Sequence, residues 1–193
     1  TDYFIAWHEP MKKEAVKIHH FNPAKVFVSG PIRFDYHFFD EASTLSREEF
    51  LQSKNLDPAN KTILYSTQKG HLFEEEFLKK MIDLRSSGAI PYVNILVRVH
   101  PVAKAGRFSE FSGLDDVYVE KPPEVMTSQD FINLKLSLHY CDININYSST
   151  VSLEAILLDK PVINYIEPGM PIYDYDHYRP LVEAGAVRLV SQN

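Results

Sequence analysis

Short apolar runs alternate with amphipathic segments along most of the chain. The apolar runs are rich in β-branched and aromatic residues, and they predict strands at 3–7, 25–30, 62–66, 94–100, 116–120, 143–147, 161–166 and 186–190. Between them, apolar residues recur with helical spacing at 9–18, 46–50, 71–84, 128–141 and 149–159. This alternation predicts an α/β fold with a doubly wound, mostly parallel, Rossmann-like sheet.

Two features refine this picture. The segment LDPANK interrupts the pattern, so we expect one unit over 1–60 and a second unit over 61–193. Continuous runs such as VINYI are typical of strands that helices cover on both faces. In such sheets ligands bind beyond the carboxyl ends of the strands, where loops lead into helices.

Composition excludes several classes of function. The chain has 193 residues, a net charge of −6 and 24% charged residues, so it lacks the basic field that nucleic acid requires. Cys141 is the single cysteine, which excludes an internal disulfide and fits a reducing compartment such as the cytoplasm. We expect that thiol to be buried and inert. No apolar run approaches the roughly 20 residues of a membrane span, and we expect no signal peptide.

A cluster of three hydroxyl residues follows the strand at 143–147. Ser148, Ser149 and Thr150 open the next helix, where backbone N–H groups have no internal partners and the helix dipole favours negative charge. Amides and hydroxyls together could hold a phosphate, and Glu154, four residues after Thr150, could accept bonds from ribose hydroxyls. The alternative is plain capping by one serine.

The segment RVHP, a later helix and the run CDININYSSTVSLEAILLDKPVINY resemble the donor-binding domain of GT-B glycosyltransferases. They are most similar to relatives of UDP-N-acetylglucosamine 2-epimerase and CDP-glycerol glycerophosphotransferase. The resemblance covers about residues 3–190, including a strand that ends in Gly-x-x-x-x-Asp from Gly30 to Asp35. It implies that 1–60 is the end of a truncated N-terminal domain with its linking segment. Residues 61–193 would then be the nucleotide-sugar donor-binding domain.

The resemblance also implies roles for the hydroxyl cluster. Ser148, Ser149 and Thr150 match a Ser-Gly-Gly start that binds the nucleotide diphosphate, and Glu154 matches a glutamate that binds ribose. Both glycines are missing here, which limits how closely the backbone can approach a phosphate. Serine and threonine hydroxyls could replace the backbone contacts to the phosphate, as in the Ser-Ser variants of the glycerophosphotransferase relatives.

Two further segments are candidates for diphosphate binding. His100 ends its strand, where the imidazole could donate to a phosphate oxygen or cap the strand against a backbone carbonyl. The loop STQKGH at 66–71 corresponds to a family loop near the phosphates, which makes Lys69 a candidate cation and places Thr67 and Gln68 in the cleft. Lys69 could equally be a solvated loop residue. Arg98 is expected in a structural ion pair.

Other segments have weaker counterparts in the family. Gly30 would lie across the cleft from the helix start, and Tyr118 belongs to VYVEKPP, where the family's backbone holds the nucleobase edge. The loop YDYDHY at 173–178 could contact a sugar or simply be solvated. The histidines show no metal-ligand spacing, and we expect neither a metal nor a cofactor besides the nucleotide-sugar substrate.

The leading hypothesis is a donor domain that transfers a sugar to a glycan or lipid-linked acceptor in surface polysaccharide synthesis. No catalytic base is assigned, since the family usually places it in the N-terminal domain, and membrane attachment at the inner face stays open. A UDP-sugar 2-epimerase-like enzyme is one alternative, although Leu153 stands in place of that family's Gln-Glu-Glu run. A noncatalytic nucleotide-binding domain is another.

Overall fold

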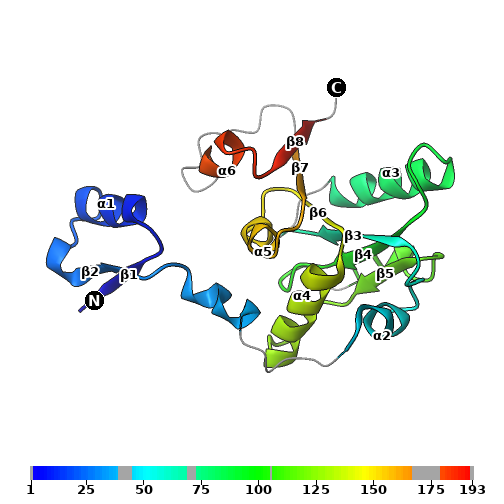
Figure 1. The fold of residues 1–193 in the computed structure, drawn as a ribbon, viewed down its shortest axis with the longest axis horizontal. Helices are drawn as coiled ribbons and strands as arrows, with labels where there is room; N and C mark the ends of the chain where they lie inside the picture. The colour runs from blue at the N-terminus through cyan, green and yellow to red at the C-terminus, as the bar shows by residue number, and fades with distance from the viewer. Residues whose placement is uncertain (1, 39–44, 69–72, 105, 167–178, 192–193) are drawn as a thin grey trace. The chain divides into compact units, whose positions relative to one another are not determined.

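A computed structural model describes residues 2–38, 45–68, 73–104, 106–166 and 179–191 (Figure 1). The chain forms two compact units, Thr1–Ala42 and Ser43–Asn193. Each unit has its own buried apolar core, and each is described by itself below.

The first unit is a short β–α–β segment. Strands β1 (Phe4–Ala6) and β2 (Val26–Val28) pair in parallel, and α1 (Glu9–Lys17) connects them. Two short 3-10 turns, Pro23–Lys25 and Ile32–His37, flank β2. Helix α1 begins where the sequence predicts, because the Nδ1 atom of His8 accepts a hydrogen bond from the Met11 N–H at 3.2 Å and Pro10 fits the first turn.

The second unit contains a fully parallel sheet of six strands in the order β5-β4-β3-β6-β7-β8. The strands are β3 (Lys61–Ser66), β4 (Val93–Arg98), β5 (Val117–Glu120), β6 (Ile143–Asn146), β7 (Val162–Ile166) and β8 (Arg188–Ser191). Ser66 at the end of β3 lies opposite both Arg98 and Asn146. The carboxyl ends of the three central strands are therefore level with one another. The predicted doubly wound α/β fold is confirmed.

Helices cover the two faces of this sheet (Figure 1). Helix α3 (Glu74–Ser86) packs on the face formed by residues such as Ile95 and Val97. Helices α4 (Ser128–Tyr140) and α5 (Val151–Leu157) pack on the other face, against residues such as Leu64 and Leu96. A short helix α6 (Arg179–Glu183) precedes β8. Parallel sheets require this double cover because both faces of their strands are apolar.

Helix α2 (Arg47–Gln52) belongs to the second unit. It begins with a capping box, in which the Ser46 hydroxyl and the Glu49 carboxylate bond each other's backbone N–H groups. Phe50 and Leu51 are 2% and 0% exposed in the core beneath α4. The expected boundary at residue 60 therefore falls inside the second unit, because α2 buries its apolar face there rather than linking two domains.

Helix α3 buries only the middle of its apolar face. Leu78 and Met81 are buried, whereas Phe73 and Leu84 are 49% and 39% exposed. Phe73 precedes the first turn, because the helix begins at Glu74. In α4, Leu134 and Leu138 are buried, whereas Phe131 is 41% exposed.

Candidate functional site

Three loops meet at the carboxyl edge of the central strands, and direct bonds join two of them. The Thr67 N–H donates to the Arg98 carbonyl at 3.0 Å, and the Thr67 hydroxyl accepts from the His100 N–H at 3.0 Å. The third loop, Ser148–Thr150, follows β6, which pairs with β3 on its other side. The sequence-predicted residues His100, Thr67 and the hydroxyl cluster thus lie at the same edge of the sheet.

A buried side chain, Asn146, holds the Ser148–Thr150 turn. Its Oδ1 atom accepts hydrogen bonds from the N–H groups of Ser148 at 2.9 Å and Ser149 at 2.8 Å. The same oxygen accepts from Ser152 Oγ at 3.1 Å and from Asn164 Nδ2 at 2.7 Å. Asn146, Ser152 and Asn164 are each at most 1% exposed. Buried polar groups bonded this fully fix a single local geometry.

This network changes how the turn could hold a phosphate. The N–H groups of Ser148 and Ser149 point inward to Asn146, so in this structure they do not form the expected amide cradle. Thr150 stands at the N-cap of α5 without a side-chain capping bond, and the Ser149 hydroxyl accepts from the Val151 N–H at 3.3 Å. Plain capping thus accounts for one hydroxyl of the three. The side chains of Ser148 and Ser149 are half-buried, whereas that of Thr150 is exposed.

Ser148 has a backbone conformation that L-residues rarely adopt. Its φ angle is +95°, in the region that favours glycine. Non-glycine residues in sparsely populated regions store about 1–3 kcal/mol of strain, and such strain is concentrated at functional sites. The Asn146 network therefore holds a strained turn in place.

Replacing Ser148 with glycine is expected to stabilise the fold by about 0.5–1 kcal/mol, because relief of strain exceeds the added entropy of the unfolded chain. Urea denaturation of Ser148→Gly and of the control Ser148→Ala, which keeps the Cβ atom, measures the effect. Equal stability of the two variants would contradict a strained serine at this position.

His100 is set to donate from its outer ring nitrogen. The Nδ1 atom accepts a hydrogen bond from the Val102 N–H at 3.2 Å, so the neutral imidazole carries its proton on Nε2. The side chain is half-buried. Arg98, two residues earlier, forms the expected ion pair: its NH1 atom lies 2.7 Å from the Glu120 carboxylate, and both side chains are largely buried.

Of the remaining predicted residues, Lys69 and the loop 173–178 lie outside the described residues. Glu154 is 0% exposed on α5, so its ribose-binding role stays a prediction. Tyr118 lies under the Lys54 ammonium, 4.7 Å from the ring centroid, and lines a separate groove beside edge strand β5. Gly30, with φ +83°, belongs to the first unit, and its place in a cleft also stays a prediction.

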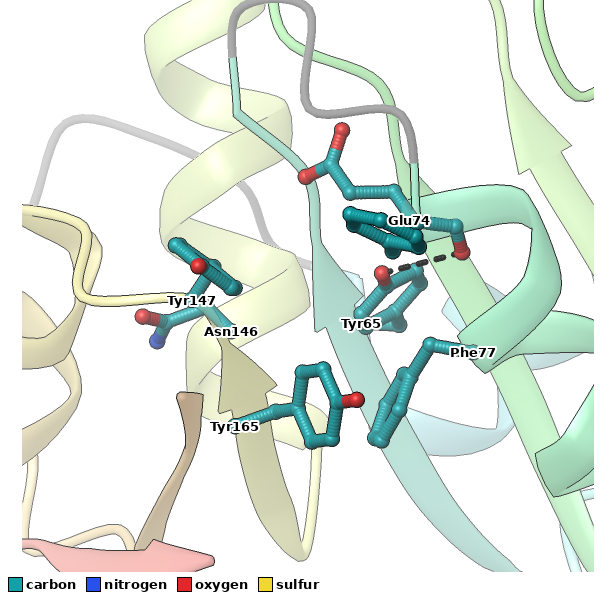
Figure 2. A pocket seen from close by; sticks show the side chains of 7 residues that line it. Tyr65, Glu74, Phe77, Asn146, Tyr147 and Tyr165 are labelled. Atoms are coloured by element: carbon teal, nitrogen blue, oxygen red, sulfur yellow. Dashed lines mark hydrogen bonds between the residues drawn. The ribbon is translucent and has the colours of Figure 1, made fainter. Parts of the chain in front are cut away.

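An aromatic pocket lies on the α3 side of the same edge. Figure 2 shows the rings of Tyr65, Tyr147, Tyr165 and Phe77 gathered at the ends of β3, β6 and β7 and the start of α3. The Phe77 and Tyr165 centroids are 4.5 Å apart, and the Tyr65 hydroxyl donates to the backbone carbonyl of Glu74 at 3.2 Å. Burial raises the pKa of Tyr65, so this hydroxyl stays protonated and remains a hydrogen-bond donor.

The residues that sequence reasoning missed are Asn146, Asn164, Glu74 and Arg107. The two asparagines lie inside predicted strands, where alternation predicts burial and carries no signal about side-chain partners. An asparagine at an interior position of a central strand is itself unusual, because β-propensity disfavours it. The repeated pattern in ININ, with asparagines on one face, was the available signal.

Other kinds of site find less support within the part of the chain that the structure describes. No group of three or more His, Cys, Asp or Glu side chains could hold a metal ion among those residues. In the same residues, no helix is both long and apolar enough to cross a membrane. Cys141 is buried, and burial raises the pKa of its thiol to about 12, as expected for an inert cysteine.

Comparison with solved structures gives the fold a family context. The chain superposes with a TM-score of 0.58 and 18% identity on a variant of the wall teichoic acid polymerase TagF soaked with CDPG, covering 92% of this chain and 40% of that one. For the Methanocaldococcus jannaschii UDP-GlcNAc 2-epimerase in complex with UDP-GlcNAc and UDP, the score is 0.66 at 18% identity, covering 100% and 51%. The fold is of the GT-B type.

A third solved structure agrees with this assignment. A UDP-N-acetylglucosamine 2-epimerase from Listeria monocytogenes, described as putative, gives a TM-score of 0.65 at 16% identity, covering 100% of this chain and 48% of that chain. The chain thus spans about half the length of these GT-B-type proteins. No protein family and no curated protein matches at the level of sequence.

Proposed function

We propose that this chain is the donor-binding half of a GT-B glycosyltransferase, which binds a nucleotide-sugar and transfers the sugar to a glycan or lipid-linked acceptor. The observation that carries the proposal is the Ser148–Thr150 turn, which Asn146 holds in a strained geometry at the carboxyl edge of a GT-B-type sheet. Ligands of doubly wound sheets bind at that edge. Two of the similar solved structures carry nucleotide-type ligands, CDPG for TagF and UDP with UDP-GlcNAc for the epimerase.

In this proposal the diphosphate lies against the hydroxyls of Ser148, Ser149 and Thr150, with the Nε2–H of His100 as a further donor. Neutral hydroxyl and imidazole N–H donors stabilise the charge that develops on the leaving group. Lys69 would add a cation, and Glu154 would bind the ribose once its carboxylate is reached by the ligand. A base that deprotonates the acceptor would come from a partner domain, and no cofactor takes part.

The proposal places the protein in the cytoplasm, where nucleotide-sugars would be its substrates, and it assigns surface polysaccharide synthesis as the process. An epimerase-like activity is the second candidate, because UDP-GlcNAc 2-epimerases are among the structural relatives. Release of UDP from UDP-GlcNAc without any acceptor would favour that candidate over transfer.

A thermal-shift panel of UDP, CDP, GDP, CMP and their sugar conjugates tests nucleotide binding. We expect one nucleotide class to raise the melting temperature, since a ligand at 100 times its Kd stabilises by about 2.7 kcal/mol. The shift should shrink in Glu154→Gln, which keeps the shape of the side chain. If no member of the panel shifts the wild type, the donor-binding function is wrong.

A further inference from the structure

A buried ion cluster joins the loops that follow β3 and β4. The Glu74 side chain is 3% exposed, and one of its carboxylate oxygens accepts a hydrogen bond from the Gln68 N–H. The other oxygen accepts from NH1 of Arg107 at 2.9 Å. Arg107 also forms a two-point contact with Glu75, at 2.7 Å from Nε and 3.1 Å from NH2. Such fork geometry fixes orientation as well as distance.

The backbone beside Arg107 is strained. Phe108 is 2% exposed and has a φ angle of +67°, which is a rare conformation for a bulky residue. The Arg107 guanidinium stands 5.0 Å from the centroid of the Phe108 ring. Surrounding structure must hold such a conformation in place, and backbone strain of this kind is typical of functional regions. The ion cluster and the strained residue are therefore two independent signs of a constrained loop.

These contacts converge on the proposed phosphate-binding edge. Gln68 follows Thr67, whose hydroxyl accepts from the His100 N–H. Arg107 belongs to the same loop after β4 as His100, and its ion pair with Glu74 joins that loop to the start of α3. Figure 2 shows Glu74 among the residues that line the aromatic pocket, with its carboxylate pointing away from the Tyr65 ring.

We propose that Glu74 and Arg107 are positioning residues that lock the loops after β3 and β4 together, so that Thr67 and His100 are preset for the phosphates of the nucleotide-sugar. The ligand part of this inference rests on the proposed function. In this proposal the Glu74–Arg107 clamp does not touch the ligand, because the Glu74 carboxylate bonds Arg107 and the Gln68 N–H, and the Arg107 guanidinium bonds Glu74 and Glu75. It acts by removing conformational freedom that binding would otherwise have to remove.

The double variant Glu74→Met with Arg107→Met separates positioning from stability. Removing one partner of a buried ion pair destabilises strongly, whereas replacing both with apolar side chains of similar length is often neutral. We therefore expect the double variant to melt near the wild type while each single variant melts lower. Without the clamp, the Gln68 amide should exchange with deuterium at least about tenfold faster, and nucleotide affinity should fall about tenfold.

Two measurements on the 193-residue chain test the positioning role of Glu74 and Arg107. The first is NMR-detected hydrogen exchange of the Gln68 and His100 amides without ligand. The second is calorimetric titration with the nucleotide that the thermal-shift panel selects. Arg85→Met is the matched control, because Arg85 is also buried and binds the carbonyls of Val93 and Asp115 at the amino end of the sheet. That control should leave both the Gln68 exchange rate and the affinity unchanged.

Each outcome bears on one claim. Unchanged Gln68 exchange in the double variant would show that the clamp does not hold the loop. Faster exchange with wild-type affinity would overturn its role in positioning for the ligand. If the wild type binds no nucleotide, the proposed function fails, while the exchange rates still decide whether Glu74 and Arg107 fix the loop.

Discussion

Replacing Asn146 with alanine is expected to lower the free energy of unfolding by about 3–4 kcal/mol. The substitution removes an oxygen that accepts four hydrogen bonds, and it leaves the N–H groups of Ser148 and Ser149 without that acceptor. A buried donor without a partner costs about 1–3 kcal/mol, and loss of the side chain adds a small cavity. The effect should be among the largest of any polar substitution in this chain.

Urea denaturation of Asn146→Ala measures this cost directly. Asn133→Ala is the control, because Asn133 lies on α4 and its side chain accepts only one exposed bond, from Gln129. That control should change stability by less than about 0.5 kcal/mol. A cost below about 1 kcal/mol for Asn146→Ala would mean that the asparagine network does not hold the Ser148–Thr150 turn.

Removing the three hydroxyls is expected to weaken nucleotide binding about a hundredfold. The triple variant Ser148→Ala, Ser149→Ala and Thr150→Val keeps the approximate shape of the turn and leaves the Asn146 bonds to the backbone in place. Each hydroxyl that bonds a charged phosphate contributes about 1.5 kcal/mol or more, and we expect two of the three to do so.

Calorimetric titration with the selected nucleotide compares this variant with Ser87→Ala. Ser87 caps the far end of α3, and its exposed hydroxyl bonds only the Leu84 carbonyl. The control should bind like the wild type. Affinity within twofold of the wild type in the triple variant would place the phosphates elsewhere.

Periodicity predicted most of the architecture because the elements are locally encoded. The capping box at Ser46 and Glu49 forms as the spacing indicates, and the continuous apolar runs become buried parallel strands. The compact units divide after Ala42 and not at residue 60, because the sequence of α2 does not say which core Phe50 and Leu51 join. That choice depends on tertiary packing.

The candidate site was predicted in its location and only partly in its contacts. Their positions at the ends of predicted strands were enough to identify Ser148, Ser149 and His100 as candidate phosphate-binding residues. The partners that hold them are distant in sequence: Arg107 lies 33 residues from Glu74, and Asn164 lies 18 from Asn146. Hydrophobic periodicity carries no information on such pairings. Strain at Ser148 and Phe108 is likewise a property of φ angles, which residue type alone does not set.

The most direct test of the account is an NMR titration of the chain with UDP and CDP and with their sugar conjugates. The account predicts saturable binding with the largest amide shifts at Ser148, Ser149, Thr150 and His100. Shifts confined to the groove beside β5, around Lys54 and Tyr118, or no shifts at any concentration, would contradict it.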